Sequence, residues 1–120
     1  LSINGDGGFM YNVQELATAA KYNVNVVAIV FVDGAYGNVR RMQEELYDGR
    51  IIASDLQNPD FVKMAGSFGC AAYRADSPDE LAKVLPNAFK EAGPAVIEVP
   101  FPKTPDPWPI IIPRHNRPSG

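Results

Sequence analysis

The sequence predicts an α/β fold in which a parallel sheet is flanked by helices. Residues 26–32 form a continuous apolar run rich in β-branched side chains, which is typical of a strand buried on both faces. Shorter apolar segments, at residues 71–74 and 95–99, alternate along the chain with segments of helical periodicity. Such alternation favours parallel strands joined by helical crossovers. At 120 residues the chain is expected to form at most one domain with a sizeable core.

The first half of the chain is predicted to contain the end of a strand, a helix, a complete strand and a second helix. Residues 1–4 resemble the last part of a buried strand, so we expect a sheet that is incomplete at the N-terminus and a chain that is part of a longer protein. Asn12 with Glu15 three residues later matches a capping box, which indicates a helix start. Residues 39–47 carry mixed charge with Met42 and Leu46 on one side, which indicates a short helix.

The second half is predicted to contain two helices around a short strand. Asn58 as the cap and Pro59 at the first helical position indicate a helix that ends at Gly69. Ser77 begins a second capping-box pattern, which predicts a helix extending to about residue 92. Pro86 lies inside that helix and is expected to kink or split it.

The last part of the chain differs in composition from the first 100 residues. Seven prolines among residues 100–120 are incompatible with helix or sheet interior, so we expect an extended, proline-rich tail at residues 101–120. Trp108 and the isoleucines at 110–112 are too apolar to remain in water. The tail is therefore expected to pack on its own domain or on a neighbouring domain or subunit.

Composition excludes several classes of protein. A formal net charge of −3 provides no basic footprint for nucleic acid. The longest apolar run, residues 26–32, is too short to span a bilayer, so we expect neither a signal peptide nor membrane association. The single cysteine, Cys70, excludes an internal disulfide and fits a reducing, cytoplasmic location.

Two acidic, glycine-rich turns follow apolar runs, and α/β proteins bind ligands at such strand ends. The turns are Gly5-Asp6-Gly7-Gly8-Phe9 and Asp33-Gly34-Ala35-Tyr36-Gly37. Asp6 and Asp33 can each supply a carboxylate oxygen to Mg²⁺, and the backbone carbonyl of Ala35 can supply another. The pattern therefore predicts a magnesium site.

The glycines of the first turn favour an anionic ligand beside that cation. Gly5, Gly7 and Gly8 allow unusual backbone dihedrals and close approach of a phosphate to the backbone. The helix expected near Asn12 directs its free amide groups toward the same region. Together the two turns indicate a magnesium–diphosphate site.

Several blocks of the sequence, taken with these turns, resemble one known family. The blocks are the two turns and residues 14–19, 61–69, 78–81 and 93–99. In order and spacing they are similar to the diphosphate-binding domain of the thiamine-diphosphate-dependent enzymes of the acetolactate synthase and 2-oxoacid decarboxylase family. The resemblance covers residues 1–100, which we expect to form the cofactor- and Mg²⁺-binding domain.

The resemblance implies roles for individual residues. Asp6 would be the first Mg²⁺ ligand, Asp33 would take the place of the second, usually an asparagine, and Ala35 would contribute its carbonyl. Val32 departs from the family pattern, because a polar asparagine usually stands there. The residues expected to bind the cofactor are Gly5, Asp6, Gly7, Gly8, Asp33, Ala35 and Tyr36.

The resemblance also implies an activity for the whole protein. Such enzymes decarboxylate a 2-oxoacid and then transfer or release the acyl unit. Their cofactor is activated by a glutamate from a different domain, usually on the partner subunit, so we expect a homodimer or homotetramer. No catalytic residue is expected in this chain, which by itself should be inactive.

Three alternatives remain open from the sequence. Another reaction on the same scaffold, such as an oxidation, would require a flavin in the whole protein. A catalytically inactive relative, acting as a structural or regulatory subunit, is favoured only by Val32. A magnesium-dependent receiver domain could use Asp33 as phosphoacceptor, but no lysine lies at the end of a later strand, since Lys103 follows in the proline-rich segment.

Overall fold

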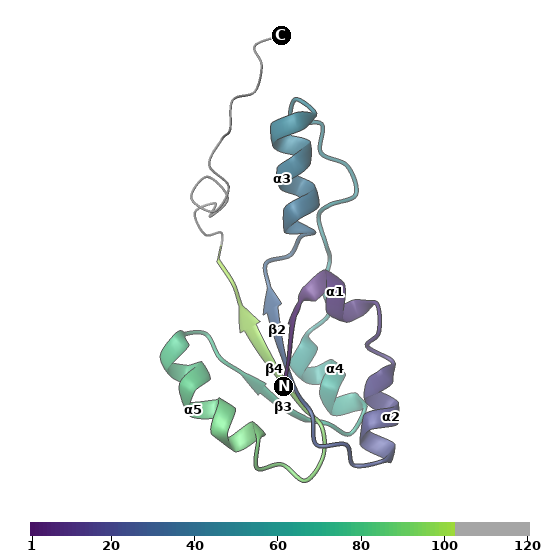
Figure 1. Cartoon of the computed structure of the whole chain (residues 1–120), viewed down its shortest axis with the longest axis vertical. Coiled ribbons are helices and arrows are strands. Elements are labelled where there is room, and N and C mark those ends of the chain that lie inside the picture. Colours follow the sequence, from purple (N-terminus) through teal and green to yellow (C-terminus); the bar gives the residue numbers. More distant parts are fainter. Residues whose placement is uncertain (103–120) are drawn as a thin grey trace.

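The computed structural model describes residues 1–102 and shows a four-stranded parallel sheet with helices on both faces (Figure 1). The strands are β1 (Ser2–Gly5), β2 (Val27–Val32), β3 (Ala71–Arg74) and β4 (Ala95–Pro100), in the spatial order β1-β2-β4-β3. The predicted α/β class is confirmed. The expectations for Trp108 and most of the tail lie outside the described residues.

The two central strands are rich in buried apolar residues. Val30 of β2 and Ile97 of β4 are completely buried, as expected for strands covered on both faces. In the register of the sheet, Gly5 lies beside Phe31. The carboxyl ends of β1 and β2 therefore lie next to each other, which places the residues that follow them at the same edge.

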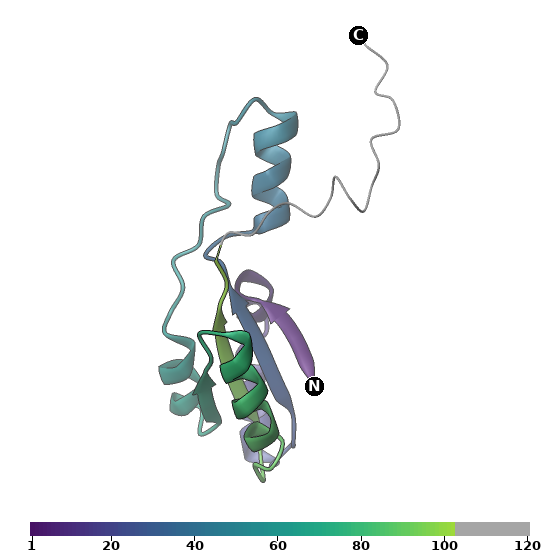
Figure 2. The ribbon, with the colours of Figure 1, turned by 90° about the vertical axis from the view of Figure 1, so that its left-hand side faces the viewer.

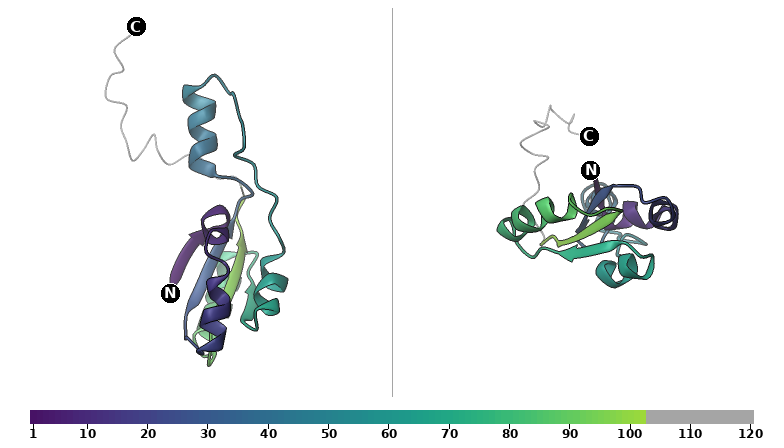
Figure 3. Two further views of the ribbon diagram at one scale, coloured as in Figure 1. Left: turned by 90° about the vertical axis from the view of Figure 1, so that its right-hand side faces the viewer. Right: turned by 90° about the horizontal axis from the view of Figure 1, so that it is seen from below.

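Residues 1–102 contain five helices, and all but the third lie in two layers around the sheet, as the view from below shows (Figure 3). The helices are α1 (Asp6–Met10), α2 (Glu15–Lys21), α3 (Gly37–Leu46), α4 (Phe61–Ser67) and α5 (Pro78–Ala88). Phe9, Leu16 and Phe61 from α1, α2 and α4 pack in one core cluster with Val30. A second cluster on the opposite face joins α5 to residues of β2 and β4 such as Ile97.

Helix α3 projects beyond the carboxyl ends of the strands (Figures 1 and 2). It contains no buried residue, and its apolar side chains Met42 and Leu46 are exposed. The return segment is fastened to it by Gln43, whose side chain bonds both backbone groups of Ile52 and the hydroxyl of Ser54. Helix α3 and the segment that follows it thus connect the second turn to α4, and α3 contributes no residue to the core.

Two predicted helix starts were wrong. The chain is already helical from Asp6, and α2 begins after Gln14, so Asn12 caps no helix. Burial of Phe9 explains the early start, because that contact outweighs the poor helix propensity of two glycines. Helix α4 begins at Phe61 rather than Pro59, and its cap is Asp60 instead of Asn58.

The predicted helix cap at Ser77 and the predicted helix end at Gly69 are confirmed. Ser77 caps α5 by accepting a hydrogen bond from Glu80 N at 3.2 Å, and Gly69 follows α4 with a φ of +80°. Pro86 does not split α5, which continues through it to Ala88 rather than to about residue 92. Pro86 lies in the last turn, where only one hydrogen bond is lost. Within residues 1–102, no helix has the length and apolar character needed to cross a membrane.

Candidate functional site

The two acidic turns predicted from the sequence meet at the carboxyl end of β1 and β2. Asp6 begins α1 directly after β1 and is almost completely buried, with 1% of its surface exposed. The backbone N–H of Gly34, in the turn after β2, donates to Asp6 Oδ2 at 2.8 Å. A hydrogen bond therefore joins the turns across 28 residues of sequence.

Two further donors complete the surroundings of the Asp6 carboxylate. Gly7 N donates to Oδ1 at 2.8 Å, and the side-chain amide of Asn58 donates to Oδ2 at 2.5 Å. The sequence pattern predicts Asn58 as a helix cap and does not predict this contact, because nothing in the local pattern indicates a partner 52 residues away. All three donors are neutral.

The second buried carboxylate among residues 1–102, Glu98, has a cationic partner. Glu98 on β4 pairs with Arg74 at 2.6 Å and also accepts from Phe61 N at 3.0 Å, so a cation offsets its charge. Among the ion pairs of residues 1–102, none involves Asp6. An ionised carboxylate taken out of water without a counter-charge is costly, so this site suits a bound cation.

The second turn, whose Gly34 N–H contacts Asp6, carries the other predicted oxygen ligands. Asp33 is exposed, and its Oδ1 accepts a hydrogen bond from Ala35 N at 3.1 Å. Gly34 has a φ of +73°, a left-handed conformation that favours glycine and lets the chain turn back. No backbone hydrogen bond found among residues 1–102 uses the Ala35 carbonyl.

This donor set fits Mg²⁺ better than a transition metal. Within the described part of the chain, no three acidic, histidine or cysteine side chains are grouped as metal ligands. Two carboxylates and a carbonyl would leave the remaining positions to water and phosphate oxygens, which is how Mg²⁺ is usually bound in proteins. The residues present are therefore compatible with a magnesium–diphosphate complex.

The glycines of the first turn have different surroundings. A Cβ on Gly7 would lie 2.4 Å from Cε1 of the Tyr36 ring, so this position must be glycine for Tyr36 to lie where it does. A Cβ on Gly8 or Gly5 would meet nothing within 4 Å. Gly8 is exposed and leaves its backbone accessible, whereas Gly7 is buried beneath an aromatic ring.

Tyr36 forms an aromatic pair at the edge of the site. Its ring stacks on that of Tyr11, with centroids 6.3 Å apart and an interplanar angle of 27°. The side-chain hydrogen bond with Tyr11 is the main cause that raises the pKa of Tyr36, followed by desolvation. Tyr11 was not singled out from the sequence, and no motif indicates it.

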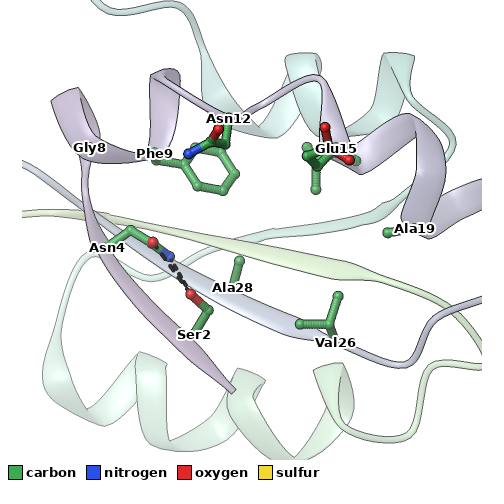
Figure 4. A pocket seen from close by; sticks show the side chains of 10 residues that line it. Ser2, Asn4, Gly8, Phe9, Asn12, Glu15, Ala19, Val26 and Ala28 are labelled. Carbon is green, nitrogen blue, oxygen red and sulfur yellow. Dashed lines mark hydrogen bonds between the residues drawn. The ribbon is translucent and has the colours of Figure 1, made fainter.

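A groove lies beside α1 and α2 along the edge strand β1, with a volume of about 240 Å³ (Figure 4). Gly8 of the first turn lines it, together with Asn12 and Glu15, which do not act as the predicted capping pair. Asn4 and Ser2 of β1 line the opposite side and are hydrogen-bonded to each other at 3.0 Å. The groove is therefore continuous with the glycine turn.

Comparison with known proteins identifies the family. The family described as "Thiamine pyrophosphate enzyme, C-terminal TPP binding domain" matches residues 1–99. Acetolactate synthase of Bacillus subtilis is 42% identical over 100 residues, which are 83% of this chain and 17% of that protein. A probable acetolactate synthase large subunit of Methanocaldococcus jannaschii is 40% identical over 100 residues, 82% of this chain and 17% of its own length.

A solved structure shows the same architecture. Benzoylformate decarboxylase from Polynucleobacter necessarius superposes with a TM-score of 0.80 at 28% identity, covering 87% of this chain and 20% of that chain. The chain thus spans about a fifth or less of the length of the relatives it matches. Together with the geometry of the two turns, these matches show that the chain belongs to the C-terminal, TPP-binding domain family of the thiamine pyrophosphate enzymes.

Proposed function

We propose that this chain binds the diphosphate of thiamine diphosphate through Mg²⁺, as part of an enzyme that acts on a 2-oxoacid. The observation that carries the proposal is Asp6, a buried carboxylate with three neutral donors and no ion-pair partner among residues 1–102. A divalent cation offsets its charge, and a diphosphate offsets that of the cation.

The predicted site residues of the two turns then have distinct roles. Asp6 and Asp33 hold the cation through carboxylate oxygens, and Ala35 holds it through its carbonyl. Gly8 and Gly5, where the structure leaves open space, admit the diphosphate. Tyr36 covers Gly7 and limits access of water to that side of the turn. Asp33 in place of the usual asparagine adds one negative charge, which strengthens cation binding and weakens diphosphate binding.

The chemistry follows from the cofactor and the relatives. Bound thiamine diphosphate would supply stabilisation of the negative charge that develops at the carbonyl carbon of a 2-oxoacid as CO₂ leaves. Acetolactate synthases and a benzoylformate decarboxylase among the relatives support transfer or release of the acyl unit as the outcome. The groups that transfer protons to and from the substrate are proposed to lie elsewhere in the whole protein.

We further propose that the whole protein acts as a homodimer or homotetramer in the cytoplasm. The ligands proposed here hold only the diphosphate end of the cofactor, and the free thiol of Cys70 fits a reducing compartment. We infer that a second domain or subunit supplies the groups that contact the rest of the cofactor.

The experiment is a substrate screen with the whole protein. Purified protein is supplied with thiamine diphosphate and Mg²⁺, and CO₂ release is measured from pyruvate, 2-oxobutyrate and benzoylformate. The proposal expects release that requires both the cofactor and the metal with at least one 2-oxoacid. Absence of release from every 2-oxoacid tested, in protein that binds the cofactor, would favour a non-catalytic relative.

That second candidate has one observation in its favour. Val32, at the end of β2, packs against the core cluster of α1, α2 and α4 and offers no polar side-chain atom to support the second turn. The experiment above separates the two candidates, because an inactive relative binds cofactor without turnover. Family membership argues against the receiver-like alternative.

A further inference from the structure

One neutral side chain reaches the buried carboxylate from far along the chain. Asn58 Nδ2 donates to Asp6 Oδ2 at 2.5 Å. This amide is not needed to begin helix α4, because Asp60 caps it by accepting from Lys63 N at 2.9 Å. The contact between Asn58 and Asp6 therefore serves something other than the helix start.

The backbone before Asn58 is fastened to the second turn. Tyr36 N donates to the carbonyl of Ser54, and Leu56 N donates to the carbonyl of Gly34, each at 2.8 Å. Asn58 follows this short antiparallel pairing by two residues. The segment that delivers the amide is thus attached to the same turn that carries the second predicted ligand, so the position of one depends on the other.

The two carboxylate oxygens of Asp6 accept different numbers of hydrogen bonds from the three donors. Oδ2 accepts from Gly34 N and from Asn58, whereas Oδ1 accepts only from Gly7 N. Each carboxylate oxygen has about two lone-pair sites. Oδ2 is therefore filled by the donors found in residues 1–102, and Oδ1 keeps one lone pair for a further ligand.

We propose that Asn58 is a positioning residue for the cation site. By holding Oδ2, its amide fixes the rotation of the Asp6 carboxylate, so that Oδ1 is the oxygen that binds Mg²⁺. Partners that orient a metal ligand typically change metal affinity by about 10–100-fold when they are removed. The proposal rests on the proposed function, because it assumes a cation at Asp6.

The test measures metal affinity rather than turnover. Mn²⁺, which prefers the same oxygen ligands and is detected by electron paramagnetic resonance, is titrated into the whole protein at saturating thiamine diphosphate. Asn58→Ala removes the amide, and Asn58→Leu removes it while nearly keeping the shape of the side chain. Gln57→Ala is the matched control, because Gln57 is the residue before Asn58 and its side chain is exposed.

The expected result is a dissociation constant for Mn²⁺ raised about tenfold in both Asn58 variants and unchanged in Gln57→Ala. The melting temperature without metal separates positioning from structure. A variant that melts earlier but binds Mn²⁺ within twofold of the wild type would show a purely structural role and overturn the proposal.

Two further outcomes are informative. If the wild-type protein shows no metal-dependent binding of thiamine diphosphate, the proposed function fails and the role of Asn58 fails with it. If both variants fail to fold, the test moves to wild-type protein labelled at asparagine. The side-chain amide resonance of Asn58 is then expected to shift when Mg²⁺ and thiamine diphosphate are added, and an unchanged resonance would overturn the proposal.

Discussion

The adjacent glycines of the first turn differ in how much space surrounds them, and alanine substitutions should reveal it. A Cβ at position 7 would lie 2.4 Å from Cε1 and 2.8 Å from Cδ1 of Tyr36, and 3.0 Å from Cδ1 of Leu56. A Cβ at Gly8 meets nothing within 4 Å. Both glycines lie in the same short helix, α1, so the two substitutions share the same backbone context.

The magnitudes follow from two opposing effects. Alanine in place of glycine stabilises a helix interior by about 0.5–1 kcal/mol. Overpacking costs about 1–3 kcal/mol, and the clash with Tyr36 is partly relieved if its half-buried ring moves. We therefore expect Gly7→Ala to lose about 1 kcal/mol net, while Gly8→Ala gains up to about 1 kcal/mol.

Urea denaturation followed by circular dichroism measures the free energy of unfolding of both variants. The double variant Gly7→Ala with Tyr36→Ala is the control, because removal of the ring should recover most of the loss caused by Gly7→Ala alone. Equal stabilities for the two glycine variants, or no recovery in the double variant, would refute the packing of Tyr36 against Gly7.

Three further predictions concern other parts of the molecule. Arg74→Gln should reduce the free energy of unfolding by about 1–3 kcal/mol in urea denaturation, because buried Glu98 loses its cation; a loss below about 0.5 kcal/mol, the ordinary scatter of surface substitutions, would contradict the pairing. The hydrogen bond with Tyr11 raises the pKa of Tyr36. The contribution of this hydrogen bond to stability is therefore present below the ordinary tyrosine pKa of about 10, and it is lost as the pH rises through the pKa of Tyr36 in the folded state. In Tyr36→Phe the midpoint of urea denaturation should fall less steeply with pH above about 10. The same pH dependence in the variant and the wild type would contradict this role of Tyr36. Burial raises the pKa of the Cys70 thiol, so a thiol reagent should modify it slowly in native protein and quickly in urea; fast native modification would show that the thiol is accessible.

The strands of this fold could be predicted because their signals are local. The apolar run ending at Val32 and the segment Ala71–Arg74 form strands where the sequence predicts them. Helix starts were less predictable, because tertiary contacts decided them. Burial of Phe9 against Phe61, with ring centroids 5.9 Å apart, makes a glycine-rich turn helical, and no local pattern contains that contact.

In the candidate site, too, the features with a local sequence signal could be predicted and those set by tertiary contacts could not. The placement of Asp6 and Asp33 directly after two neighbouring strands was predictable, because glycines mark the turns there. Asn58 was not, because an Asn-Pro-Asp sequence offers two possible caps and only the folded chain shows that Asp60 takes that role. Gly7 was predicted to face a diphosphate, and the structure shows the Tyr36 ring against it, a contact across 29 positions of sequence.

The central claim is that the Asp6 carboxylate holds a cation that binds the diphosphate of thiamine diphosphate. Calorimetric titration of the whole protein with thiamine diphosphate, with and without Mg²⁺, tests it most directly. Asp6→Asn keeps the shape of the side chain and removes the charge. The account predicts tight binding in the wild type that requires Mg²⁺ and is lost in Asp6→Asn. Binding that is independent of Mg²⁺, or unchanged in Asp6→Asn, would contradict it.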